Sequence, residues 1–203
     1  LSSEIAESSQ MLNKITGSFR LEDYSDDVVY VMARNFRDPS VLQAVQEKRS
    51  NPILFTGGGI LSSSFIAAAP KIAHVHPGNL PHVRGADGLL WSTLVRGRPG
   101  AACFYMNEGI DTGEIIETLD LPPLTFEIPD AVRPDDQMLY RALFSFYDPL
   151  VRARVFGDVL NRYDGQLPNS GDSQPSNAGT TYHFMHEDVR AKALMKIFVS
   201  AER

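Results

Sequence analysis

Residues 52–96 read PILFTGGGILSSSFIAAAPKIAHVHPGNLPHVRGADGLLWSTLVR, and this stretch decides the fold class. Two short apolar runs, residues 52–55 and 72–76, alternate with two stretches of helical character, residues 60–69 and 88–96. Strands that alternate with helices are typical of an α/β fold, in which a mostly parallel sheet is flanked by helices. Ligands of such sheets bind at the carboxyl ends of the strands, so we expect the turns after the two apolar runs to carry the site.

The same pattern continues on both sides of this stretch. The further elements expected are strands over residues 28–33, 101–106 and 114–119, and helices over residues 2–15, 39–48, 135–160 and 187–198. Pro149 is expected to interrupt the longest helix, because proline has no N–H to donate inside a helix. Residues 165–181 are rich in Gly, Ser, Asn and Pro. We therefore expect one α/β domain over residues 1–164, followed by a flexible loop and helical extension over residues 165–203.

The composition describes a globular protein and excludes several classes of partner. The chain has 203 residues, 43% of them hydrophobic, which is enough for one sizeable core. A net charge of -6 argues against a nucleic-acid partner, and no apolar run approaches the roughly 20 residues that span a bilayer. The single cysteine, Cys103, predicts a cytoplasmic protein without disulfides. The residues after Leu1 do not resemble a secretion signal, so we expect a trimmed chain; the sequence does not indicate its oligomeric state.

Polar residues that can carry chemistry fall at the ends of the predicted strands. His74 and His76 are two residues apart, so on a strand both imidazoles point to one face. The turn of Gly57, Gly58 and Gly59 ends the preceding strand, and Asp111 follows in a later turn. These segments are expected to converge on one edge of the sheet, where the two histidines and the carboxylate would form a catalytic site.

A metal site is an alternative interpretation of the same residues. A His-x-His pair with a downstream aspartate is a common zinc ligand set, and His82, His183 or His186 would complete it. On this interpretation His74, His76 and Asp111 are the ligands of a metal-dependent hydrolase.

Three pieces of sequence follow one another in order. Residues 74–81 read HVHPGNLP, residues 84–86 read RGA, and residues 111–113 read DTG. They resemble the Asn-x-His-Pro-x-x-Leu-Pro, Arg-Gly-Ala and Asp-x-Gly motifs of the folate-dependent formyltransferases, a family that includes the glycinamide ribonucleotide, methionyl-tRNA, amino-sugar and hydroxyornithine formyltransferases. The resemblance implies a Rossmann-like formyltransferase fold. It also implies a transferase of one-carbon metabolism that uses N10-formyltetrahydrofolate as its formyl donor and needs no metal.

The resemblance also assigns roles to residues of the site. The catalytic residues it implies are His74, His76 and Asp111, with His74 in place of the family's asparagine. An imidazole N–H of His74 is expected to replace the amide as donor to the oxyanion that forms during transfer. His76 would stabilise the same oxyanion, and Asp111 would orient His76 and relay the proton of the attacking amine. The residues implied to border the folate are Gly57, Gly58, Gly59, Ile60, Leu61 and Asp111.

The acceptor is expected to be a small amine, such as an amino sugar or hydroxyornithine. Methionyl-tRNA formyltransferases add a basic tRNA-binding domain, and the purine enzymes carry a phosphate-binding loop near the N-terminus. We find neither in this sequence, which opens on a predicted helix where the family has its first strand. A second alternative is a binding protein of this fold that has lost catalysis through the histidine at position 74.

Overall fold

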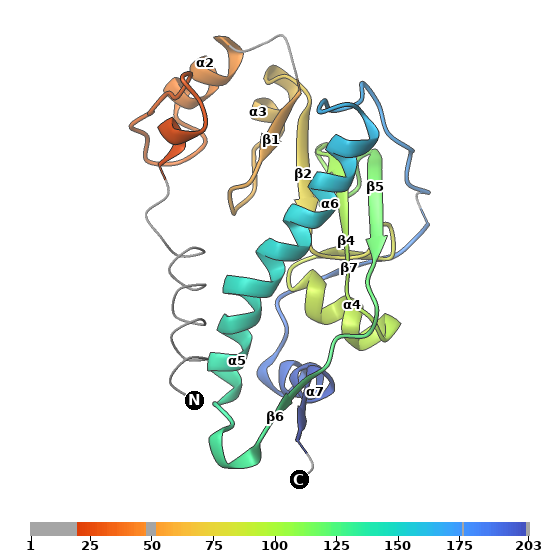
Figure 1. Ribbon diagram of the computed structural model, residues 1–203. Helices are drawn as coiled ribbons and strands as arrows, with labels where there is room; N and C mark the ends of the chain where they lie inside the picture. Colours follow the sequence, from red (N-terminus) through yellow and green to blue (C-terminus); the bar gives the residue numbers. More distant parts are fainter. Residues whose placement is uncertain (1–19, 48–51, 176, 202–203) are drawn as a thin grey trace. The chain divides into compact units, whose positions relative to one another are not determined.

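A computed structural model describes residues 20–47, 52–175 and 177–201 (Figure 1). Its contacts divide the chain into two compact units, Leu1–Ala44 and Val45–Arg203. The helix expected over residues 2–15 lies outside the described residues. The boundary expected after residue 164 does not coincide with this division and stays a prediction.

In the first unit, the strand expected over residues 28–33 is not formed. This segment pairs with no other strand of the described chain, and the unit holds only a 3₁₀ turn, Leu21–Asp23, and most of α2 (Pro39–Glu47) as described regular structure. Val29, Tyr30 and Met32 are exposed, Met32 to 96%. A β-branched run is stable as a strand only where a neighbouring strand or a core covers it. The local pattern was therefore misleading here.

The second unit is built on a four-stranded sheet. Its strands, in spatial order, are β1 (Ile53–Phe55), β2 (Ile72–His76), β4 (Gly100–Tyr105) and β5 (Ile115–Asp120). β1 and β2 are parallel, whereas β2 with β4 and β4 with β5 are antiparallel. The pairing changes from parallel to antiparallel at β4, because the chain returns to the sheet next to the end of β2. There His76 pairs with Ala102.

Two small sheets of parallel strands join distant parts of the chain. They are formed by β3 (Val83–Gly85) with β7 (Thr180–Tyr182), and by β6 (Phe126–Ile128) with β8 (Phe198–Ser200). Three of the five strand pairs in the described chain are thus parallel. The α/β fold class with flanking helices is confirmed, and parallel pairing holds for these three pairs.

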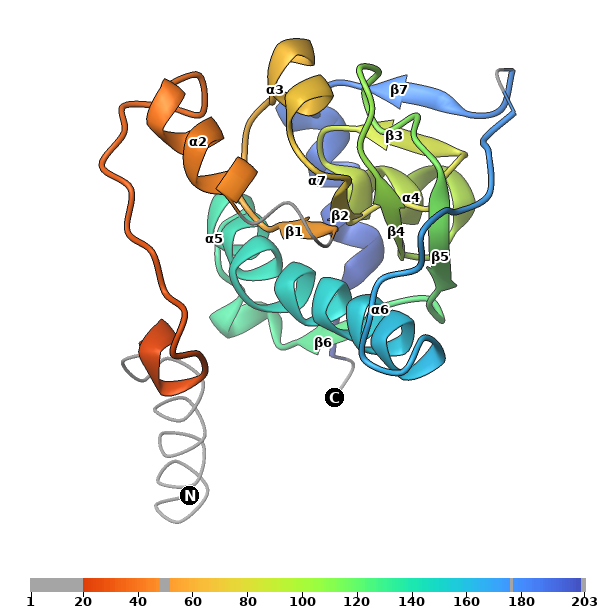
Figure 2. The same ribbon diagram turned by 90° about the horizontal axis from the view of Figure 1, so that it is seen from above.

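Helices cover both faces of the four-stranded sheet. The helices of this unit are α3 (Ser63–Ala68), α4 (Gly88–Arg96), α5 (Asp136–Ala142), α6 (Asp148–Arg162) and α7 (Glu187–Ile197), with a 3₁₀ turn at Asp130–Val132. In Figure 2, α6 lies on one side of the sheet and α4 on the other. Alternation along β4 serves both layers: Cys103 packs beneath α6 with Val155, whereas Phe104 packs on the opposite face with Leu80.

A second core lies between α4, α5 and α7. Leu90, Leu143, Leu194 and Ile197 are almost completely buried there. This packing makes the helix expected at the end of the chain part of the body of the unit. No helix of the described residues combines the length and the apolar character that a bilayer span requires.

The long helical stretch changes its hydrogen-bonding pattern before its proline and not at it. α5 runs into a π-helical turn, Leu143–Tyr147, and α6 then begins with Pro149 in its first turn. Proline is tolerated at this position because the first N–H groups of a helix have no partner within it. The expected interruption is therefore displaced upstream, and Asp148 begins the helix that faces the candidate site.

Candidate active site

His74 and His76 lie at the carboxyl end of β2, as the sequence predicted. Alternation turns Ala73 and Val75 into the core beneath α6 and turns the two histidines to the other face of the strand. The ring of His74 makes an edge-on contact with that of Phe104, its register partner on β4, at a centroid distance of 6.0 Å. The two imidazoles therefore share one face at the end of a buried strand.

His76 is enclosed by backbone and by a carboxylate. Only 3% of its surface is exposed, and its Nε2 donates a hydrogen bond to the Val83 carbonyl at 3.0 Å. Its Nδ1 lies 3.4 Å from Oδ2 of Asp111. A Cβ at Gly78 would overlap the imidazole, and a Cβ at Gly88 would lie 2.9 Å from Nε2. Two glycines thus leave the ring just enough room for this one position.

Asp111 is held in place by segments from several parts of the chain. Its backbone has a left-handed φ of 54°, which aspartate tolerates in turns, and its Oδ2 accepts the Gly85 N–H at 2.7 Å. The Gln174 side chain donates to the carbonyls of Asp111 and Gly113, and Arg84 donates to Gln174 in turn. Sequence reasoning missed Gln174, because a glutamine inside a loop carries no pattern that would mark it.

The His76–Asp111 pair is arranged to accept one proton in addition to the one that neutral His76 carries. Burial lowers the pKa of His76, and the charge of Asp111 opposes this shift. In neutral His76 the proton lies on Nε2, since the Val83 carbonyl can only accept, and the lone pair of Nδ1 then faces the carboxylate. A proton that arrives from a reacting group would lie between these two atoms and satisfy both.

His74 is fixed in one tautomer by a neighbouring strand. Its Nδ1 lies 2.7 Å from the Phe55 carbonyl, which can only accept, so Nδ1 carries the proton and Nε2 of the neutral ring has a lone pair. Burial is the main cause that lowers the pKa of His74. The N–H of neutral His74 is already used, so the oxyanion-donor role expected from the resemblance would require the imidazolium form.

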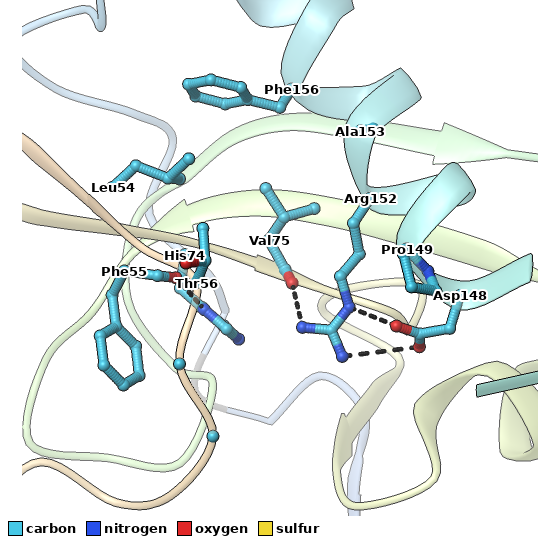
Figure 3. A pocket seen from close by; sticks show the side chains of 12 residues that line it. Leu54, Phe55, Thr56, His74, Val75, Asp148, Pro149, Arg152, Ala153 and Phe156 are labelled. Atoms are coloured by element: carbon cyan, nitrogen blue, oxygen red, sulfur yellow. Dashed lines mark hydrogen bonds and ion pairs between the residues drawn. The ribbon is translucent and has the colours of Figure 1, made fainter. Parts of the chain in front are cut away.

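A pocket of about 510 Å³ opens beside His74 at the end of β1 (Figure 3). Its lining residues are Leu54, Phe55, Thr56, Gly57, Gly58, His74, Val75, Asp148, Pro149, Arg152, Ala153 and Phe156. The walls come from the ends of β1 and β2, from the turn after β1 and from the first three turns of α6. His76 and Asp111 are not among the lining residues, so of the three catalytic candidates the structure places only His74 at this pocket.

An ion pair on α6 forms the polar wall of this pocket. Asp148, with 5% of its side chain exposed, accepts from Nε of Arg152 at 2.6 Å, and Nη1 of Arg152 donates to the Val75 carbonyl at 3.1 Å. Burial raises the pKa of the Asp148 carboxyl, and the Arg152 charge opposes this shift. Sequence reasoning missed both residues, although an acid followed four positions later by a base on a helix is a recognisable signal.

The turn predicted to border the folate divides into two parts. Gly57 and Gly58 line the pocket, and open space surrounds the position of a Cβ at Gly58 and Gly59. The side chain of Ile60 is 84% exposed, whereas Leu61 is buried. The turn therefore offers backbone and one apolar side chain to a ligand, and Leu61 holds it to the core.

The metal alternative finds no matching cluster. Among the residues that the structure describes, no three histidine, cysteine, aspartate or glutamate side chains are grouped so that they could hold a metal ion. His74 and His76 instead use ring nitrogens to contact the carbonyls of Phe55 and Val83. The hydrolase interpretation is not favoured.

The sheet and its covering helices have the fold of solved formyltransferases. The formyltransferase PseJ from Anoxybacillus kamchatkensis, solved in complex with UDP-4,6-dideoxy-4-formamido-L-AltNAc and tetrahydrofolate, matches with a TM-score of 0.53 over 93% of this chain and 92% of its own, at 19% identity. A sugar N-formyltransferase from Shewanella sp. matches with a TM-score of 0.54 over 80% of this chain and 65% of its own, at 17% identity.

Sequence comparison points to the same class. A methionyl-tRNA formyltransferase from Syntrophus aciditrophicus is 33% identical over 93 residues, which are 43% of this chain and 30% of that relative. The chain thus spans less than a third of the length of this curated relative. No family model matches the chain. The resemblance to the folate-dependent formyltransferases is confirmed by these relatives together with the fold.

Proposed function

We propose that this chain is a formyltransferase that moves a formyl group from N10-formyltetrahydrofolate to the amine of a small molecule. The observation that carries the proposal is the buried His76–Asp111 pair at the carboxyl end of β2, in a chain with the formyltransferase fold. The folate bound to the neighbour from Anoxybacillus supports the choice of donor. The single cysteine, Cys103, supports a cytoplasmic setting.

The residues around the site fit a folate. Gly58 and Gly59 leave open space above the turn after β1, and exposed Ile60 adds an apolar surface on which a flat ring can lie. We assign Gly57, Gly58, Gly59, Ile60, Leu61 and Asp111 to the donor side of the site; Gly57 and Gly58 also line the pocket, so donor and acceptor would meet at this turn. When bound, the donor supplies an activated formyl carbon for attack by an amine.

The residues of the chain then supply acid–base chemistry and positioning. The His76–Asp111 pair receives the proton that the attacking nitrogen must lose and returns it to the leaving nitrogen. His76 can do this without moving, because the Val83 carbonyl and two glycines fix its ring. His74 completes the catalytic set at the edge of the pocket.

A small acceptor suits the size of this pocket. A volume of about 510 Å³ with largely apolar walls lies within the usual range for small-molecule sites. The neighbours from Anoxybacillus and Shewanella are sugar-directed by their descriptions, and an amino sugar is therefore the first class of acceptor to try.

The test is a formyl-transfer assay on the full chain with a panel of amines, of which several carry a sugar. Wild type should transfer formyl from N10-formyltetrahydrofolate, and His76→Ala or Asp111→Ala should lower the rate by about 10²-fold or more, as loss of acid–base catalysis does. His82→Ala is the matched control, because His82 is exposed and away from the pocket lining.

Two further readouts separate the alternatives. A folate analogue should raise the melting temperature of wild type by mass action. Chelation should change neither stability nor transfer. Binding of the analogue without transfer to any amine would favour the binding protein, and transfer lost on chelation would favour the hydrolase.

A further inference from the structure

His74 lines the pocket, and its tautomer indicates what it does there. We propose that Nε2 of His74 takes the proton from the ammonium group of the acceptor, which enters the pocket between β1, β2 and α6. The inference rests on the proposed function and deepens it, since it selects acceptors that are protonated amines over amines that are already neutral.

The geometry of His74 leaves one nitrogen for a ligand. The Phe55 carbonyl lies 2.7 Å from Nδ1 and fixes the proton there. Figure 3 shows the other ring nitrogen pointing away from this carbonyl, and His74 is one of the residues that line the pocket. A lone pair is what an ammonium N–H can donate to, whereas the nitrogen of the formyl donor carries no hydrogen. Nε2 therefore suits the ammonium of the acceptor rather than the formylated nitrogen of the donor.

The groups around His74 favour its neutral form. The charged and titratable groups that face it are His76 from its own strand, Asp111 from the turn between β4 and β5, and Asp148 and Arg152 from α6. Burial lowers the pKa of His74 most. Its hydrogen bond to the Phe55 carbonyl and the two carboxylates oppose this, while Arg152 acts in the same direction as burial. A base must be unprotonated before it reacts, and this environment keeps it so near neutral pH.

The step balances without any further reagent. One N–H bond of the acceptor ammonium breaks, its electron pair stays on nitrogen, and the proton forms a bond to Nε2. The products are a neutral amine, which can attack the formyl carbon, and a His74 imidazolium, which returns its proton to solvent through the open pocket. The second proton of the amine is left to the His76–Asp111 pair.

The substrate class follows from this step. An alkylammonium has a pKa near that of lysine, about 10.4, so it must lose a proton before attack. An N-hydroxylated amine is far less basic and is already neutral at pH 7. A site that places a base beside the acceptor is useful only for the first kind, so the structure favours a primary alkylamine, such as that of an amino sugar, over hydroxyornithine.

The first measurement needs no acceptor. Long-range ¹H–¹⁵N NMR spectra of the ¹⁵N-histidine-labelled full chain should show His74 at pH 7.5 with a proton on Nδ1 and a bare Nε2, and His74→Asn assigns the signals. Arg152→Gln should move the titration of His74 to higher pH, because it removes a cation beside the ring. A proton on Nε2 of His74 in neutral wild type would overturn the proposal.

The second measurement uses a matched pair of acceptors, ornithine and N5-hydroxyornithine, with glucosamine as a further ammonium probe. For the ammonium acceptors, kcat/KM should fall at acid pH in wild type. His74→Asn should lower it by about 10²-fold at pH 7 and replace that acid limb by a rise that continues toward the pKa of the acceptor itself, whereas transfer to N5-hydroxyornithine should change less than about tenfold. His82→Asn, at an exposed histidine, is the control and should leave the acid limb in place.

The outcomes separate this inference from the proposed function. Equal losses for both kinds of acceptor in His74→Asn, or an unchanged acid limb, would overturn the role of His74 while formyl transfer itself stands. If wild type transfers formyl to no amine, the proposed function fails. The inference then fails with it, even if the NMR spectra show an Nε2 without a proton, because no acceptor exists for this base.

Discussion

A single methyl group at Gly78 should displace the histidine on which the chemistry depends. In Gly78→Ala, the new Cβ would overlap Nε2 of His76 and lie 2.8 Å from the Val83 carbonyl oxygen. Gly88 also packs closely against the ring, since a Cβ there would lie 2.9 Å from Nε2. The side chain must therefore leave the position in which it contacts both Val83 and Asp111.

The cost can be worked from these contacts. Overpacking of a closed site costs about 1–3 kcal/mol, and loss of the hydrogen bond to Val83 adds about 1 kcal/mol. At about 2–4 °C per kcal/mol for a unit of this size, the melting temperature should fall by roughly 5–15 °C. A shift of the ring by about 1 Å should lower formyl transfer by about 10²-fold, because reacting groups act only when aligned.

The assay compares two glycine-to-alanine variants by thermal melting and by formyl transfer. Gly157→Ala is the control, since this glycine lies inside α6 with open space around it. Alanine is the better helix former by about 0.5–1 kcal/mol, so this variant should melt slightly higher and keep its activity. Wild-type melting and wild-type activity in Gly78→Ala would refute the close packing around His76.

Three further predictions concern stability and reactivity. The free energy of unfolding should decrease as pH falls below about 6.5. The unfolded state binds protons at His74 and His76 there, whereas the folded state, in which both pKa values are lowered, does not. Urea titrations at several pH values should show this pH dependence, and the dependence should weaken in His76→Gln. Cys103 should resist a thiol reagent at pH 8 until the chain is unfolded, because burial raises its pKa to about 12; rapid labelling of the native chain would contradict this. Leu90→Ala should cost about 2–5 kcal/mol in urea unfolding, against less than about 0.5 kcal/mol for exposed Leu150→Ala, and similar values for both would argue against the second core.

Elements with a complete local signal were predicted well. β2 and α4 have the bounds that the sequence indicated, because an apolar run with proline or glycine at its ends determines a short buried strand or helix almost alone. The segment over residues 28–33 has the same local signal but no partner, and it forms no strand. The strands of the two small sheets, such as β3 and β7, were missed because their pairing depends on distant segments.

The site was predicted as far as its motifs reach. His76 and Asp111 are together, as their spacing at strand ends indicated, and their catalytic roles stay predictions. Gln174 and Arg152 could not be placed beforehand, because each acts through a tertiary contact: one with the Asp111 turn, the other with the Val75 carbonyl. The tautomer of His74 depends on a single carbonyl of the neighbouring strand, which a sequence pattern does not show.

The pairing of β3 with β7 has a consequence for the order in which the chain can mature during synthesis. Gly85, whose N–H holds Asp111, is followed by Ala86, whose N–H donates to the Tyr182 carbonyl at 3.0 Å. These partners are separated by almost half of the chain, so the last residue of β7 must have left the ribosome before this hydrogen bond can form. A nascent or prematurely ended chain would carry both histidines and Asp111 but lack the strand that pairs with β3, whose Gly85 holds Asp111. Chaperones and proteases would meet such chains with an open active site and an uncovered second core.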